Sequence, residues 1–305
     1  MTIGQIHFIN LDQSADRLTK FRRVNSHIDT IRVLASDGSR LDRAQLFREG
    51  IITNDLSYPP GSLGCAISHI NLWKVAISGD RNITICEDDS IFAKNFYDQS
   101  ASVCSTLPQD WDLIQWGYDF DPKYVWINLG LVKAKLEFYD RKSASDSAEF
   151  HSSNRVAVML AHSFGLQCYS LSPRGAKILL NTCLPLRDRI ISFPSTNVII
   201  KNLGIDCIMN DAYSKMKAYV CIPPLIIHDI AQKRSVYIRV PELKRQLAVP
   251  TIIDPMIPGT EPRVDSNNRS IQPIHLNCTG ELKTRSPLPY ADLDNDIRPL
   301  SRNGV

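Results

Sequence analysis

The sequence predicts an α/β fold in which helices flank a parallel, nucleotide-binding type of sheet. Two observations support this prediction: short apolar runs alternate with stretches of helical periodicity, and a cluster of carboxylates directly follows one of the apolar runs. The chain has 305 residues, of which 43% are hydrophobic and 22% are charged. This is enough for one catalytic-sized domain with an appendage.

The first part of the chain alternates predicted strands and helices. Apolar runs predict strands at residues 6–9, 31–34, 82–86 and 111–116. Periodic spacing predicts a helix that Ser14 caps and whose apolar face runs to Ile28, and a short helix at residues 42–49 that Gly50 ends. A long helix is expected at residues 62–78, after Ser62 and before Gly79. These elements form an α/β nucleotide-binding half at about residues 1–135.

A second half is expected at about residues 155–240, which makes residues 1–240 one domain. A strand is predicted at residues 166–171, and Ser172 with Pro173 predicts the start of a helix that runs through Leu180. The polar segment 140–154 is predicted to be a mobile loop. Residues 241–305 hold nine of the 18 prolines and no sustained period, which predicts an irregular C-terminal extension.

Charge and cysteine content narrow the class of protein. The net charge of +3 gives no reason to expect a nucleic-acid partner. The eight cysteines form no CxxC pair and several lie in apolar runs, so buried free thiols in a reducing compartment are expected. The first residues lack a basic segment followed by a long apolar stretch, and no run of about 18 apolar residues occurs. We therefore expect a cytoplasmic protein without a membrane span.

Three adjacent carboxylates, Glu87, Asp88 and Asp89, follow the strand predicted at residues 82–86. Such like charges repel one another unless a positive partner is present, and oxygen ligands favour Mn²⁺ or Mg²⁺. In an extended chain Glu87 and Asp89 point the same way and Asp88 points opposite. One carboxylate could then bind a metal while another holds its water or a sugar hydroxyl. A solvated acidic turn is the structural alternative.

Several segments resemble glycosyltransferase family 25, in the order in which that family has them. The segments are Ile9-Asn10-Leu11-Asp12 with Asp16-Arg17-Leu18 (family INLDRSxDRL), Gly61-Ser62-Leu63-Gly64-Cys65 with Ser68-His69 and Trp73 (GxxGCxxSHxxxW), Ile85-Cys86-Glu87-Asp88-Asp89 (LEDD), Trp111-Asp112-Leu113-Ile114, residues 165–180, Ile205-Asp206, Pro223-Pro224-Leu225 and the region of Ser235. The likeness spans roughly residues 5 to 238, and the ordered set is more specific than any single motif.

The resemblance implies a GT-A fold, with residues 1–240 as the catalytic domain. It implies a nucleotide-sugar donor, usually UDP-galactose, and the assembly of a glycan or lipopolysaccharide with inversion at the anomeric carbon. A metal would neutralise charge on the diphosphate leaving group, and a carboxylate would take the proton of the acceptor hydroxyl. Peripheral association with the inner face of a membrane stays open.

The resemblance also implies roles for the acidic cluster and for a later histidine. Asp89 is the expected metal ligand, and Glu87 is expected to contact the ribose or a metal-bound water. Asp88 is placed on the donor side of the cluster, and strand alternation, by pointing it away from the other two, indicates that it serves structure more than chemistry. His228, after the apolar residues 225–227, would complete the metal shell, or it is simply a histidine at the end of a strand.

The first loop is expected to meet the nucleotide through Asn10, Leu11 and Arg17. An ion pair of Arg17 with Asp16 or Asp12 on its own helix is the structural alternative for this arginine.

Asp37, Ser68 and His69 complete the predicted donor side. Asp37 follows the second strand, where nucleotide-binding sheets often place an acidic residue near a ribose or base, although Asp37-Gly38 equally fits a plain turn. Ser68 and His69 match the family helix, and a packing or hydrogen-bonding role is the alternative for His69. Cys65 lies one turn from His69, but zinc is not expected because no second Cys or His pair is near in the sequence.

Asp206 is the expected general base, and Asp211, five residues later, is its competitor. Rings of Trp116, Tyr118, Tyr124 and Trp126 could stack on sugars, with core packing as the alternative.

Two kinds of function therefore compete. The first is a metal-assisted inverting hexosyltransferase. The second is an inactive homologue that binds the nucleotide sugar or glycan.

Overall fold

The computed structural model describes residues 3–118, 124–137, 148–193 and 198–229. The predicted extension at residues 241–305 and the first part of the predicted loop at residues 140–154 lie outside these ranges. The prediction of a loop is wrong for the last part of this segment, because Ala148–Ser152 forms the short helix α5. Among the described residues, no helix is both long and apolar enough to cross a bilayer.

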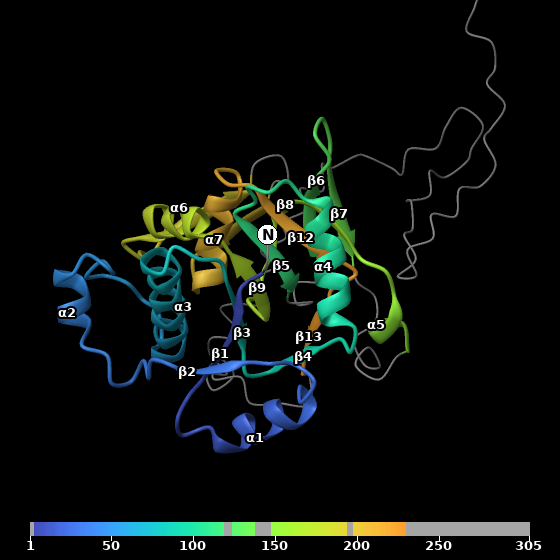
Figure 1. The fold of residues 1–305 in the computed structure, drawn as a ribbon. Helices are drawn as coiled ribbons and strands as arrows, with labels where there is room; N and C mark the ends of the chain where they lie inside the picture. Colours follow the sequence, from blue (N-terminus) through green and yellow to red (C-terminus); the bar gives the residue numbers. More distant parts are fainter. Residues whose placement is uncertain (1–2, 119–123, 138–147, 194–197, 230–305) are drawn as a thin grey trace, which may run out of the picture.

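The structure confirms the α/β fold and builds it on a nine-stranded sheet with the order β2-β1-β3-β9-β5-β12-β8-β6-β7 (Figure 1). The strands in chain order are β1 Gln5–Asn10, β2 Ile31–Leu34, β3 Ile83–Glu87, β5 Leu113–Gly117, β6 Tyr124–Asn128, β7 Lys133–Glu137, β8 Val156–His162, β9 Cys168–Leu171 and β12 Ala218–Ile222. Six of these strands run in one direction, and β7, β8 and β9 run against them.

The expected parallel arrangement holds for β2, β1 and β3, which pair side by side at one end of the sheet. It is wrong for β9, which lies between β3 and β5 and is antiparallel to both. Strand β9 carries an apolar run like that of its parallel neighbours, because all of its residues are buried whichever way it runs. Direction is therefore a property that the apolar pattern does not report.

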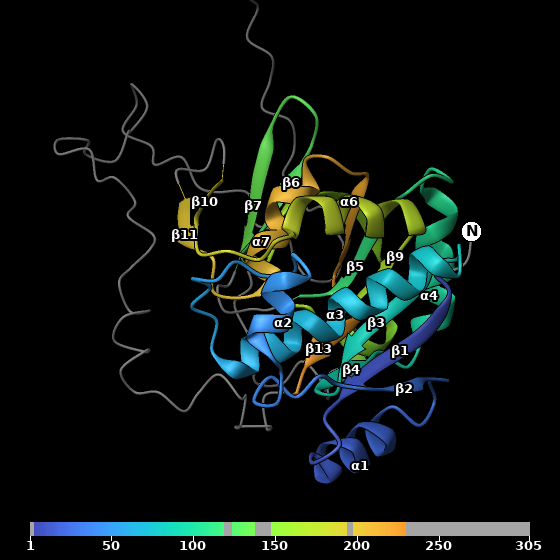
Figure 2. The same cartoon turned by 90° about the vertical axis from the view of Figure 1, so that its left-hand side faces the viewer.

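Helices lie on both sides of this sheet (Figure 1), and Figure 2 views it from the side of α3 and α6. The helices α3 Pro60–Ser78, α6 Pro173–Cys183 and α7 Ile205–Tyr213 pack on one another and on one face. The helices α1 Ala15–Val24 and α4 Phe96–Thr106 lie with α5 on the other face. The short helix α2 is Arg43–Arg48. Alternate residues of β3 serve the two cores, since Ile83 and Ile85 face α3 whereas Cys86 belongs to the opposite cluster.

Local sequence signals set several helix ends. Asp42 accepts hydrogen bonds from the backbone N–H groups of the first turn of α2, and Gly50 after it has a φ of +70°. Ser172 caps α6 by accepting from the N–H of Gly175. Helix α3 begins at Pro60, earlier than Ser62, because proline fits the first turn of a helix. Ser14 precedes α1 but makes no side-chain cap.

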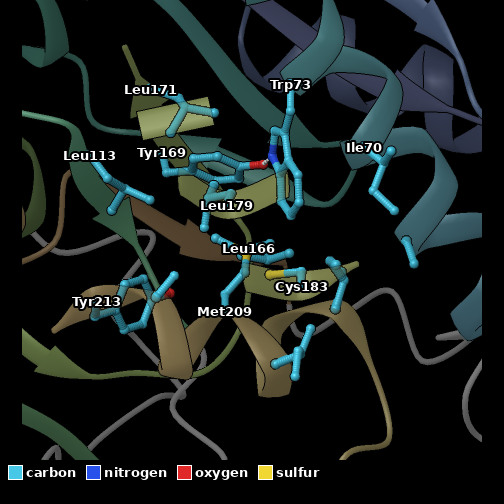
Figure 3. Close-up of a cluster of buried hydrophobic side chains, with 14 of the residues drawn as sticks. Ile70, Trp73, Leu113, Leu166, Tyr169, Leu171, Leu179, Cys183, Met209 and Tyr213 are labelled. Atoms are coloured by element: carbon cyan, nitrogen blue, oxygen red, sulfur yellow. Dashed lines mark hydrogen bonds between the residues drawn. The ribbon is translucent and has the colours of Figure 1, made fainter. Parts of the chain in front are cut away.

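The core between α3 and the sheet contains two polar groups that pair with each other (Figure 3). Trp73 Nε1 on α3 donates to the hydroxyl of Tyr169 on β9 over 2.8 Å, and both side chains are buried. Trp116, Tyr118 and Trp126 are also buried, so these three rings follow the core-packing alternative. The seven cysteines in the described residues are free thiols, five of them buried.

Two small strand pairs accompany the main sheet. Strand β10 Ile190–Phe193 pairs with β11 Val198–Lys201, and β4 Ser90–Phe92 pairs with β13 Ile226–His228. The second pair matters for the site, because its register places His228 opposite Ser90. This pairing brings His228 close to Asp88 and Asp89, which directly precede β4.

Candidate functional site

Asp88 and Asp89 form a turn that follows β3 at the carboxyl end of the strand. Asp88 accepts a hydrogen bond of 2.6 Å from Asn10 Nδ2 at the end of β1, and an ion pair from Arg17 on α1. The same guanidinium group lies 3.0 Å from Asp89 Oδ2. Together with His228, which contacts Asp89 from β13, these three residues, Arg17, Asp88 and Asp89, are called the acidic turn below.

The acidic turn differs from one structural alternative and from one expectation of the sequence analysis. Arg17 pairs with neither Asp12 nor Asp16, because α1 directs it across the sheet edge to the two carboxylates. Glu87 and Asp89 do not act as neighbours on one face, since β3 ends at Glu87 and strand alternation stops there. Instead, Asp88 and Asp89 share Arg17.

His228 reaches the acidic turn from β13. Its Nε2 lies 3.2 Å from Asp89 Oδ2, and the next residue, Asp229, donates its backbone N–H to the carbonyl of Asp89 over 2.7 Å. The other carboxylate oxygen, Asp89 Oδ1, is buried and has no hydrogen-bond partner among the described residues. An orphaned carboxylate oxygen beside an imidazole is a donor set that fits a divalent cation.

The two aspartates differ in their electrostatics. Burial raises the pKa of Asp88, against the opposing effects of Arg17 and of the hydrogen bond from Asn10. Burial also acts to raise the pKa of Asp89, but the hydrogen bond and charge of His228, together with Arg17, outweigh it and leave that pKa below its ordinary value. Asp89 is therefore held as a carboxylate, which is the form that binds a metal.

Glu87 lies apart from the acidic turn, against α3. Its Oε1 is 3.6 Å from Cys65 Sγ and 3.5 Å from His69 Nε2. His69 is fully buried, and its Nδ1 is 2.9 Å from the Tyr169 hydroxyl that Trp73 also holds. The predicted hydrogen-bonding role of His69 is thus present, together with a contact to the acidic cluster.

The structure separates the two candidate bases. Asp206 opens α7, where its Oδ2 accepts the backbone N–H of Gly165 over 3.2 Å. Burial raises the pKa of Asp206 against the backbone hydrogen bonds, and the negative charge of Glu87 adds to the rise. Asp211 lies further along the same helix and forms an ion pair with Arg189. Of the two candidate bases, Asp206 therefore lies close enough to Glu87 for the charge of Glu87 to act on it.

Asp37, Ser68 and Leu11 organise loops in the described structure. The Asp37 carboxylate accepts from both the N–H and the hydroxyl of Ser39, as an Asx turn does, and these hydrogen bonds lower its pKa. Ser68 Oγ accepts the N–H of Ser36 over 2.9 Å and so ties the loop after β2 to α3. The Leu11 carbonyl accepts from the N–H at position 14 before α1.

Two residues that shape the site, Arg32 and Gly64, were not predicted from the sequence. Arg32 Nε donates to Asn10 Oδ1 over 3.0 Å and orients the amide that holds Asp88. A lone arginine within the apolar strand β2 is a signal that could have indicated it. Gly64 was read only as part of a motif, but a Cβ there would lie 2.4 Å from the carbonyl oxygen of Ser36. Glycine is needed because α3 crosses that loop closely.

A hollow of about 750 Å³ opens beyond the acidic turn, between α1, β4 and α5. Its wall contains Lys20, His27 and Lys94, and Asp229, which pairs with Lys20. None of the residues predicted to bind the donor lines this hollow. Asp229 connects it to the acidic turn through the backbone hydrogen bond to Asp89.

Fold and site define an α/β protein with a carboxylate and histidine cluster at the carboxyl edge of its sheet. The model of glycosyltransferase family 25 (LPS biosynthesis protein) matches residues 3–194, and the chain belongs to this family.

Two curated relatives are similar to the chain. Over 197 residues, the chain is 27% identical to "Procollagen galactosyltransferase 1-A" of Xenopus laevis, and this aligned region covers 59% of the chain and 28% of the relative. Over 159 residues it is 23% identical to a "Glycosyltransferase 25 family member" of Anopheles gambiae, which covers 46% of the chain and 26% of the relative. The matched region is thus about a quarter of the length of either relative.

Among solved structures, "Crystal Structure of A197 from STIV" matches 71% of this chain and 81% of its own, with 12% sequence identity and a TM-score of 0.31.

Proposed function

We propose that the chain transfers a hexose, with galactose as the first candidate, from a UDP-sugar to a hydroxyl group of a glycan or lipopolysaccharide acceptor, with inversion. Membership of glycosyltransferase family 25 and the similarity to a relative named as a galactosyltransferase support this class of reaction. The single observation that carries the proposal is the buried, unpartnered Asp89 Oδ1 next to His228 at the carboxyl edge of the sheet.

Asp89 and His228 are the residues that would hold the divalent cation, Mn²⁺ or Mg²⁺. When bound, such a cation neutralises the charge of the diphosphate leaving group. Arg17 forms ion pairs with Asp88 and Asp89 and so keeps both side chains in place. Its positive charge reduces the repulsion between the two carboxylates when no cation is bound. Asn10 ends β1, Leu11 follows it, and Asp37 follows β2, so all three lie toward the carboxyl ends of these strands, where the nucleotide of the donor would bind.

Asp206 is the proposed general base. In the transfer step the acceptor oxygen attacks the anomeric carbon, the bond from that carbon to the diphosphate oxygen breaks, UDP leaves with the electron pair, and the hydroxyl proton passes to the Asp206 carboxylate. Two features support this role: the Gly165 N–H holds one carboxylate oxygen, and burial makes the group more basic than an exposed aspartate. Asp211 is already engaged by Arg189, which favours Asp206.

The experiment is a screen of UDP-sugars with Mn²⁺ and a panel of glycan acceptors, read as UDP release and as the mass of the product. Asp206→Asn is compared with the matched variant Asp211→Asn on the same helix. We expect Asp206→Asn to lower kcat by roughly 100-fold or more with the Kd for UDP-sugar unchanged, and Asp211→Asn to retain most of the activity. Equal activity of the wild type and Asp206→Asn would remove Asp206 as the base. UDP binding without product from any pair would favour the inactive, binding homologue.

A further inference from the structure

A second group of metal-ligating side chains lies outside the acidic turn. Cys65 and His69 are one turn apart on α3, and Glu87 ends β3 opposite them. Their ligand atoms, a thiol sulfur, an imidazole nitrogen and a carboxylate oxygen, all lie within 4.8 Å of one another. The spacing of Cys65 and His69 alone gave no reason to expect zinc, because the third ligand is distant in the sequence.

The two separations from Glu87 match those of a tetrahedral zinc site. With Zn–S of about 2.3 Å and Zn–N and Zn–O of about 2.0 Å, tetrahedral geometry puts sulfur and oxygen about 3.5 Å apart, and nitrogen and oxygen about 3.3 Å apart. Glu87 Oε1 is 3.6 Å from Cys65 Sγ and 3.5 Å from His69 Nε2. An ion could therefore enter with shifts of a few tenths of an ångström in these two pairs.

His69 provides an independent indication of a ligand. Its ring is fully buried, and Nε2, the nitrogen that faces Glu87, has no hydrogen-bond partner among the described residues. The other nitrogen, Nδ1, is held by the Tyr169 hydroxyl, which Trp73 fixes in turn. Metal-binding histidines have this arrangement, in which a partner on one nitrogen orients the other toward the ion.

We propose that Cys65, His69 and Glu87 form a binding site for a thiophilic divalent cation, Zn²⁺ above all, separate from the Asp89–His228 pair. A thiolate together with an imidazole selects zinc over Mn²⁺ and Mg²⁺, which prefer oxygen ligands. Cys65 and Glu87 are partly exposed, so water can supply the fourth ligand. Binding displaces the thiol proton to solvent as the sulfur–metal bond forms.

The test uses Co²⁺ as a spectroscopic substitute for zinc in the full chain, freed of metal by a chelator. We expect bound Co²⁺ to give a thiolate-to-cobalt charge-transfer band in the near ultraviolet, with the intensity of one thiolate-bound ion per chain, which Zn²⁺ abolishes by displacement. Cys65→Ser should lose the band and weaken Co²⁺ binding by at least about 100-fold, beyond the 10- to 100-fold effect of a residue that only orients a ligand. Cys207→Ser is the matched control, because Cys207 is also a free, half-buried thiol.

A band that is absent from the wild type, or that persists in Cys65→Ser, would overturn the proposal. His69→Gln provides a second variant that keeps the thiol, and it should lose high-affinity Zn²⁺ binding in equilibrium dialysis. Asp89→Asn should keep the band, since Asp89 belongs to the other site. This inference does not rest on the proposed glycosyl transfer: the cobalt band is measured without donor or acceptor, so the wild type can show the band and fail to release UDP, or release UDP and show no band.

Discussion

Two clusters of carboxylates lie at opposite ends of the strands of the main sheet. Their comparison shows how a candidate ligand-binding site differs from a cluster that only stabilises the fold. The acidic turn follows β3, whereas Asp112 precedes β5, and β3 and β5 run in the same direction because both are antiparallel to β9. We call Asp110, Asp112, Arg174 and Lys217 the Asp112 corner. Each cluster pairs a buried aspartate with an arginine on a helix.

The clusters differ in how fully the aspartate is satisfied. Asp112 Oδ1 accepts from Arg174 Nε over 2.6 Å, and Oδ2 accepts from the backbone N–H of Lys217 over 2.8 Å and from Arg174 over 3.1 Å. In the acidic turn, Asp89 Oδ1 accepts from no described residue. A buried carboxylate with every oxygen occupied joins elements of the fold, while one with a free oxygen is available to a ligand. Composition alone does not separate the two.

The largest expected effect comes from Asp89→Asn, which removes the charge from the oxygen that is free for a ligand. We expect kcat for sugar transfer to fall by at least about 100-fold, since loss of one electrostatic contact to the transition state costs that much. Steady-state UDP release is the measurement, with far-ultraviolet circular dichroism to check the fold. The matched variant Asp112→Asn should leave kcat within about twofold of the wild type. Similar losses in both variants would mean that the comparison does not separate function from support.

Asp112→Ala should be the largest stability effect. It leaves the N–H of Lys217 and the cap around Ser172 without their acceptor, so we expect the free energy of unfolding to fall by about 2–3 kcal/mol. Urea unfolding followed by fluorescence measures this change. A loss below about 0.5 kcal/mol would show that the corner contributes no more than an ordinary surface position.

Asp206→Asn should raise stability at neutral pH by a smaller amount. Burial raises the pKa of Asp206, so the folded state binds this proton more tightly than the unfolded chain. Stability is therefore lost as the pH rises from the unfolded-state pKa through the raised folded-state pKa, and the charged group destabilises the fold above that range. Asparagine avoids this cost. Thermal unfolding should show a higher Tm for the variant at pH 7.5 and a smaller difference at pH 4, and a lower Tm at pH 7.5 would contradict this assignment.

The smallest expected effect is that of Arg174→Lys. The Arg174 side chain is 53% exposed, so water compensates for much of what its ion pair with Asp112 contributes. We expect less than about 1 kcal/mol of destabilisation in urea unfolding and unchanged UDP release. Arg17→Lys is the informative counterpart, because Arg17 is only 24% exposed and serves both Asp88 and Asp89. A larger stability loss at position 174 than at position 17 would reverse the comparison.

The elements that the sequence predicted well are those whose signals are local. The periodicity of α3 and its ends at proline and glycine lie within one segment, as do the Asp42 cap of α2 and the Ser172 cap of α6. The ordered family motifs indicated one protein class, and the family model that matches residues 3–194 confirms that class. Assignment of each residue to a role in catalysis stays a prediction.

The sequence alone determined the α/β class, the helices α1, α2, α3 and α6, the strand that leads into the three carboxylates, and the family. Only the tertiary structure decided that β9 runs antiparallel between β3 and β5, that Arg17 joins Asp88 and Asp89, and that Glu87 turns away to Cys65 and His69. The physical reason is range. Helix caps and apolar periods act over a few neighbouring residues, whereas these contacts join residues that strand order alone brings together, and strand order leaves no local mark in the sequence.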